Sequence, residues 1–129
     1  MPDWACVAGG TLLIPSGPSG HHLFIILNKP KDFDGFLESS VLVSISTIKK
    51  ASYDDTCVLT AGTHRFIKVD SYVVYRDART ERLSNLENGV GLGLFKPHDP
   101  VTQEILDSVR QGLLDSKHTS KYLKQLDFD

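Results

Sequence analysis

The chain has 129 residues, of which 40% are hydrophobic and 23% are charged, and its formal net charge at pH 7 is −2. This composition is typical of a globular protein, so the sequence predicts a single domain over residues 1–129 and argues against a strongly basic protein that coats nucleic acid. No run of about 18 apolar residues occurs, and we therefore expect no membrane span.

The N-terminal segment MPDWACVAGG contains neither the basic stretch nor the apolar stretch of a signal peptide, which favours a cytoplasmic protein. Cys6 and Cys57 are too few and too far apart in sequence to indicate a disulfide framework or a zinc site. We predict that both are plain small residues in a reducing compartment.

Two short apolar segments follow, GGTLLIPS (residues 9–16) and HHLFIILNKP (residues 21–30), with SGPSG between them. Glycine, serine and proline favour turns, so this pattern predicts a β-hairpin whose second strand begins with His21 and His22. Because successive side chains of a strand point to opposite faces, only one of the two histidines can face a given surface.

Short strands are also expected along the middle of the chain. The segment KDFDGFLES reads as a loop with a turn at Asp34-Gly35. Three segments rich in β-branched and aromatic residues predict strands: residues 40–48, 56–60 and 71–82. Many short strands separated by glycine and proline predict a small β-barrel.

Apolar and hydroxyl side chains alternate at the end of the strand predicted at residues 40–48. The order Val43-Ser44-Ile45-Ser46 places valine and isoleucine on one face and the two serines on the other. The serines are either part of a functional surface or simply the solvated face of an ordinary strand.

The C-terminal part shows a different pattern. LENGVGLGLFKP (residues 86–97) contains three glycines but lacks the phosphate-binding order G-x-G-x-x-G, so a loop or an edge strand is expected. A helix is then predicted with Asp99 as its N-cap and Pro100 as its first residue. Its apolar residues recur every four positions and are expected to pack on the barrel: Val101, Ile105, Val109 and Leu113. A short second helix is expected in TSKYLKQLDF, capped by Thr119 or Ser120.

The order of the segments is itself informative. From the N-terminus they are GGTLLIPS, a Gly/Ser-rich loop, HHLFIILN, a strand ending in SISTIKK, VDSYVVYRDARTERL and DPVTQEILDSVRQGLL. Over about residues 8–115 this order resembles the PemK/MazF toxin family. The resemblance implies a mainly β, α+β fold, namely an SH3-like β-barrel with a C-terminal helix, usually as a homodimer. It also implies the toxin of a toxin–antitoxin pair, which cleaves single-stranded RNA without a metal or other cofactor and whose groove a cognate antitoxin blocks.

Four catalytic candidates follow from matching this sequence to the family motifs. His22-Leu23 stands where the family has Arg-Pro, and the family arginine usually contributes to catalysis. The segment SIST at residues 44–47 stands where the family has Pro-Ile-Thr-Ser, and RT at residues 79–80 matches the family's Arg-Thr. The resemblance therefore implies these catalytic residues: His22, Ser46, Thr47 and Arg79. Neighbouring polar residues are candidates for substrate binding: Ser19, Gly20, His21, Lys49, His64 and Asp77.

The chemistry of metal-free RNA cleavage suits these residue types. The 2′-hydroxyl is the nucleophile, so the enzyme must move protons and stabilise charge on the phosphorus. Histidine has an unperturbed pKa of about 6.5, which suits His22 to acid–base work. The hydroxyls of Ser46 and Thr47 can donate hydrogen bonds to a phosphate, and Arg79 can stabilise its added charge.

Simpler interpretations stand beside these. His22 is equally compatible with a polar residue at the rim of a hairpin, and Arg79 with a surface ion pair to Asp77 or Glu81. Aromatic residues are expected to be core or dimer contacts rather than stacking platforms: Phe24, Phe66, Tyr72 and Tyr75. The alternative function is a non-catalytic SH3-like barrel that binds a protein or nucleic-acid partner, which the missing arginine and the negative net charge favour. A toxin with a different target is a third possibility, because one fold hosts many activities.

Overall fold

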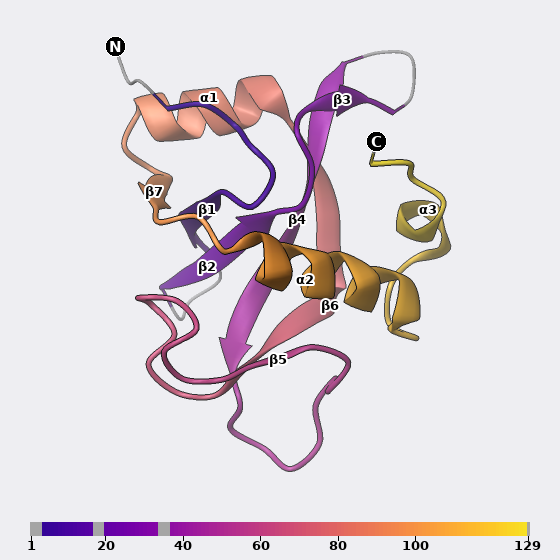
Figure 1. Cartoon of the computed structure of the whole chain (residues 1–129). Coiled ribbons are helices and arrows are strands. Elements are labelled where there is room, and N and C mark those ends of the chain that lie inside the picture. Colours follow the sequence, from indigo (N-terminus) through magenta and orange to yellow (C-terminus); the bar gives the residue numbers. More distant parts are fainter. Residues whose placement is uncertain (1–3, 17–19, 34–36, 129) are drawn as a thin grey trace.

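One antiparallel sheet organises the computed structural model, which describes residues 4–16, 20–33 and 37–128. In chain order its strands are β1 (Thr11–Pro15), β2 (His21–Ile26), β3 (Lys31–Asp32), β4 (Glu38–Thr47), β5 (Val58–Leu59), β6 (Ser71–Arg82) and β7 (Lys96–His98). Their order across the sheet is β5-β6-β4-β2-β1-β7, and β3 pairs with β4. The sheet curls into a half-barrel (Figure 1), so the expectation of a β-rich fold is confirmed.

The predicted hairpin is formed by β1 and β2, in which Ile14 lies opposite His22. The predicted strand at residues 71–82 is β6, with the same bounds. The segment expected to be a loop after β2 contains the short strand β3, which pairs with the start of β4. The turn expected at Asp34-Gly35 lies outside the described residues.

Alternation of side chains gives the sheet two apolar clusters, one on each face. The larger cluster lies under helix α2 (Gln103–Asp115) and includes Val43, Ile45, Val73, Tyr75, Val109 and Leu113. The second lies under helix α1 (Leu83–Gly91) and consists of Leu12, Ile14, Phe24, Ile26, Leu42 and Leu86. Figure 1 shows α2 crossing the sheet, with α1 lying over its upper end. The two cysteines belong to different clusters and are not joined, and burial raises the pKa of both thiols.

Helix α1 was not expected from the sequence. The segment at residues 86–97 was predicted as a loop or an edge strand, but its first half belongs to α1 and its end forms the edge strand β7. Leu86 is fully buried against the second cluster, and this packing outweighs the low helix propensity of glycine. Packing requires glycine at position 89, because a Cβ on Gly89 would clash with the ring of Phe95.

The start of α2 differs from the predicted one. The helix begins at Gln103, and the hydroxyl of Thr102 accepts a hydrogen bond from the N–H of Ile105, so Thr102 is the N-cap in place of Asp99. The carbonyl of Asp99 instead accepts a hydrogen bond from the Thr11 hydroxyl, which ties this residue to β1. The short helix α3 (Lys121–Lys124) is capped by Ser120, one of the two predicted caps.

None of the helices in the described ranges is both long enough and apolar enough to cross a bilayer.

Candidate functional site

A groove of about 450 Å³ lies on the face of the sheet that carries α1. Cross-strand register explains its floor, because Phe24 lies opposite Ser44, and Ser44 opposite Val74. We call it the His22 groove, and its lining residues are Ser16, His22, Phe24, Ser44, Ser46, Tyr72, Val74, Arg76, Asp77 and Arg79. Four predicted site residues therefore come together from three strands: His22, Ser46, Asp77 and Arg79.

His22 is held by a short hydrogen bond across the hairpin. Its Nδ1 lies 2.5 Å from the hydroxyl oxygen of Ser16, and the side chain is half-buried. When Nδ1 carries the proton, the Ser16 oxygen accepts it, and Nε2 is then an unprotonated base. The Ser16 hydroxyl can also donate to an unprotonated Nδ1, so the contact fixes the position of the ring, and the Nδ1–H tautomer is the one in which Nε2 can accept a proton.

An irregularity in β6 brings several charged side chains to this groove. Ser44 of β4 pairs with Val74 of β6, and Leu42 pairs with Arg79. The same distance thus takes more residues in β6 than in β4, so β6 bulges between these two pairs. Strict alternation would send Arg76 and Asp77 to opposite faces, but both line the groove together with Arg79. The bulge therefore concentrates charge at one end of the groove.

Two contacts hold Arg79 over the groove floor. Its guanidinium carbon lies 4.9 Å from the centre of the Phe24 ring, in a cation–π arrangement. Its Nε lies 3.4 Å from a carboxylate oxygen of Glu81, the ion pair that the simpler interpretation of the sequence expected. Because this pair is partly exposed, we expect it to contribute little to stability.

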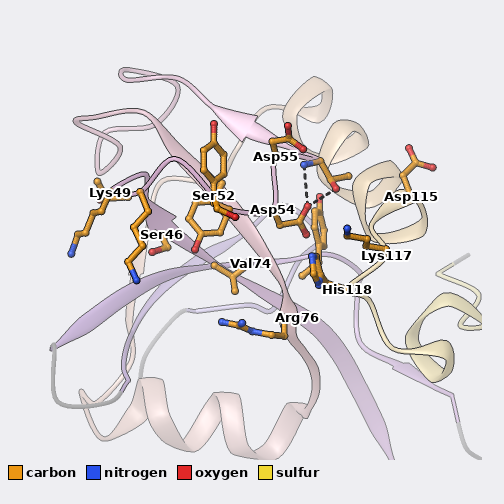
Figure 2. Close-up of a pocket in the computed structure, with 16 residues that line it drawn as sticks. Ser46, Lys49, Ser52, Asp54, Asp55, Val74, Arg76, Asp115, Lys117 and His118 are labelled. Atoms are coloured by element: carbon orange, nitrogen blue, oxygen red, sulfur yellow. Dashed lines mark hydrogen bonds between the residues drawn. The ribbon is translucent and has the colours of Figure 1, made fainter.

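A second pocket of about 810 Å³ (Figure 2) adjoins the His22 groove, with which it shares lining residues. It lies between the loop after β4, strand β6 and the end of α2, and Figure 2 shows Asp54, Arg76 and His118 around it. We call it the Tyr53 pocket, and its lining residues include Lys49, Lys50, Ser52, Tyr53, Asp54, Asp55, Asp115, Lys117 and His118. The groove and the pocket share four residues: Ser46, Tyr72, Val74 and Arg76.

Asp54 ties the loop after β4 to the end of α2. One of its carboxylate oxygens accepts hydrogen bonds from the N–H and the hydroxyl of Thr56, and the other accepts one of 2.6 Å from the buried Ser116 hydroxyl. Burial raises the pKa of Asp54, but the hydrogen bonds from Ser116 and Thr56 and the nearby His118 outweigh it. The pKa therefore lies below its ordinary value of 3.8.

This lowered pKa predicts a loss of stability in acid. The folded state holds Asp54 ionised more firmly than the unfolded chain does, so its stabilising effect is present above about pH 4 and disappears as the pH falls through the folded-state pKa. Chemical denaturation at pH 7 and pH 3 should show Asp54→Asn losing less stability on acidification than the unmodified chain. Asp55→Asn, which removes an exposed neighbouring carboxylate, is the control and should behave like the unmodified chain. An equal loss in the unmodified chain and Asp54→Asn would contradict the assignment.

The other predicted site residues lie elsewhere. Thr47 and Lys49 line the Tyr53 pocket and do not reach the His22 groove. His21 is exposed and follows Gly20, and neither lines the groove or the pocket. Ser19 is outside the described residues.

His64 is a buried residue remote from both sites. Its Nδ1 accepts a hydrogen bond from the N–H of Phe66, so Nε2 carries the proton and donates it to the carbonyl of Asp99 at 2.6 Å. Nδ1 is thus bonded within the loop before β6, and Nε2 joins this loop to the segment before α2. The structure supports a structural role for His64 and gives no reason to place it at a substrate.

Residues that the sequence did not indicate complete the site. Ser16 was seen only as part of a turn, and Arg76 only as part of a strand. Strand alternation places Arg76 on the same face as Tyr72 and Val74, a signal that the sequence did contain. Ser44 is buried at the groove floor, which excludes the solvated-face interpretation for this serine, whereas Ser46 is half-buried.

Comparison with known proteins gives no match. No protein-family model, no curated protein and no solved structure matches this chain. The function is therefore inferred from the residues and the geometry of the two adjoining sites.

Proposed function

We propose that this chain is a metal-independent endoribonuclease of the PemK/MazF type, the toxin of a toxin–antitoxin pair, with its sheet forming an SH3-like barrel. The observation that supports the proposal is the meeting of His22, Ser46 and Arg79 in one groove, from strands far apart in sequence. Together they offer a base, a hydrogen-bond donor and a fixed positive charge. These groups can take up the 2′-proton and stabilise the charge on the phosphate, two tasks that cleavage by the 2′-hydroxyl requires.

The proposed reaction begins when Nε2 of His22 takes the proton of the 2′-hydroxyl. The 2′-oxygen then attacks the adjacent phosphorus, and the bond from phosphorus to the 5′-oxygen breaks. The leaving oxygen takes up a proton from water, so the products are a 2′,3′-cyclic phosphate and a free 5′-hydroxyl. Arg79 stabilises the charge that builds up on the phosphate oxygens, and the hydroxyl of Ser46 donates a hydrogen bond to them.

Incubation of the purified protein with varied single-stranded RNAs in EDTA tests this function. We expect fragments that end in 2′,3′-cyclic phosphate, because the nucleophile belongs to the substrate. A failure to cleave any of the RNAs would overturn the proposal. Expression of the chain alone should also arrest growth, and co-expression with its antitoxin should restore it.

The proposal includes partners and a location. We infer a homodimer in the cytoplasm, and a cognate antitoxin that covers the His22 groove. Light scattering at high concentration tests the dimer, and a monomer near 14.3 kDa would count against it. If the antitoxin covers the His22 groove, adding it should prevent both the binding and the cleavage of RNA.

Ser16 is predicted to act through His22. Ser16→Ala should lower kcat about fivefold while leaving KM unchanged, because one hydrogen bond contributes roughly 1 kcal/mol to positioning the imidazole. Ser16→Thr keeps the hydroxyl and should restore most of the rate. A rise in KM with unchanged kcat would mean that Ser16 contacts RNA and does not position His22.

A non-catalytic binding module is the second candidate, and the charge of the site favours it. The Tyr53 pocket contains three lysines and three aspartates. In the His22 groove, Arg76 pairs with Asp77 and Arg79 pairs with Glu81. This balance differs from the strongly positive channels that bind nucleic acid by charge alone. Intact RNA, harmless expression and tight capture of the product of a neighbouring gene would together favour this function.

A further inference from the structure

Two tyrosines form a continuous aromatic surface where the His22 groove meets the Tyr53 pocket. The rings of Tyr53 and Tyr72 lie with their centres 5.2 Å apart and are tilted by 42°. Both side chains are half-buried, and Tyr72 lines the groove as well as the pocket. Because the two rings contact each other, a third ring cannot enter between them and would stack on an outer face of the pair.

Cationic side chains lie around this aromatic surface, in a pocket that Asp54, Asp55 and Asp115 also line. Lys49 and Lys50 follow β4, Lys117 follows α2, and Arg76 extends from β6. Among the residues that the structure describes, the three lysines make no ion pair. An aromatic platform beside unpaired cations is the combination that binds single-stranded nucleic acid, in which bases stack and phosphates meet positive charge.

The loop that carries Tyr53 is held in place. The next residue, Asp54, accepts hydrogen bonds from Thr56 and from the buried Ser116 at the end of α2. These hydrogen bonds fix the backbone next to Tyr53, while the carboxylate keeps its negative charge. A ring that is fixed before binding loses little freedom when a base stacks on it.

We propose that Tyr53 and Tyr72 form a stacking site for a nucleobase of single-stranded RNA, next to the phosphate that is cleaved at His22. The inference deepens the proposed function and rests on it. A stacking platform accepts any base, because every base has a π-face, so this site supplies affinity and position without strict sequence choice. It also changes the interpretation of Tyr72, which the sequence suggested to be a core or dimer contact.

A binding measurement tests the stacking site separately from cleavage. The probe is a short 2′-O-methyl RNA, which lacks the nucleophilic hydroxyl, and fluorescence anisotropy gives its Kd. Tyr53→Ala and Tyr72→Thr should each raise Kd about tenfold, the effect of losing one stacked base. Tyr72→Phe keeps the ring and should bind normally. Tyr122→Ala removes an exposed tyrosine that lines neither site and is the matched control.

Abasic probes distinguish stacking from a loss of fold. Moving one abasic residue along the RNA should reveal a position at which binding weakens in the unmodified protein but not further in Tyr72→Thr. Full binding by the tyrosine variants, with RNA still cleaved by the unmodified protein, would overturn the stacking site alone. Tyrosine-dependent binding without any cleavage of ordinary RNA would overturn the proposed function and keep the site. Absence of binding by the unmodified protein would overturn both.

Discussion

Replacement of His22 by alanine is expected to lower the rate of RNA cleavage by about 10²- to 10⁴-fold, the usual contribution of a positioned general base. The imidazole is half-buried in the groove, its Nδ1 is bonded to Ser16, and Nε2 is left to act on the substrate. No other histidine lines the groove among the described residues, so none replaces it there. The measurement is the single-turnover rate of cyclic-phosphate formation in EDTA.

His21 provides the matched control for this experiment. It is the adjacent residue, it is exposed, and alternation along β2 turns it to the opposite face. His21→Ala should therefore cleave RNA at nearly the unmodified rate. Equal rates for the two alanine variants would show that His22 is only a rim residue of the hairpin. Binding of 2′-O-methyl RNA by His22→Ala should be retained, which separates a chemical defect from a folding defect.

The largest expected effect on stability is at Gly112 in α2. A Cβ at this position would lie 2.0 Å from the hydroxyl oxygen of Tyr75 and 2.7 Å from its ring carbon Cζ. The same hydroxyl donates a 2.8 Å hydrogen bond to the carbonyl of Val109, so the helix rests directly on the tyrosine. Gly112→Ala should destabilise the fold by about 3 kcal/mol through overpacking and loss of this bond. Urea denaturation followed by the fluorescence of the single tryptophan, Trp4, measures the change.

A glycine-to-alanine substitution should have the opposite effect on stability where the helical glycine has free space around it. A Cβ added at Gly91, at the end of α1, would have no neighbouring atom within 4 Å. Gly91→Ala should therefore be neutral or slightly stabilising. In a Tyr75→Phe background the nearest atom is absent, and the cost of Gly112→Ala should shrink. A gain of about 1 kcal/mol in Gly112→Ala, as in an open helix, would show that α2 does not pack on Tyr75 this closely.

Local sequence patterns predicted most of the strands and helices, because in these segments the conformational preferences of the residues match the structure that forms. The hairpin of β1 and β2 has Gly/Ser/Pro at its turn, and β6 is rich in β-branched and aromatic residues. Each of these preferences acts between neighbours in the chain, and the packing of the sheet reinforces them.

Helix α1 and the N-cap of α2 were missed because distant contacts decide them. Three glycines at residues 89–93 argue against a helix locally, yet Leu86 gains burial under α1 and Phe95 needs the space that Gly89 leaves. Asp99 is a good N-cap by type, but β1 engages its carbonyl, so the helix begins later. Long-range packing of this kind commonly overrides propensity.

By itself, the sequence determined the longer strands, the presence of the C-terminal helix and the alternation that separates His21 from His22. Only the tertiary structure decided which face of the sheet becomes a groove and which residues meet there. Register aligns Ser46 with Tyr72, and the bulge in β6 brings Asp77 to the same side as Arg76. Alternation is a property of one strand, whereas register and bulges depend on pairing between strands, and one residue of shift exchanges the faces.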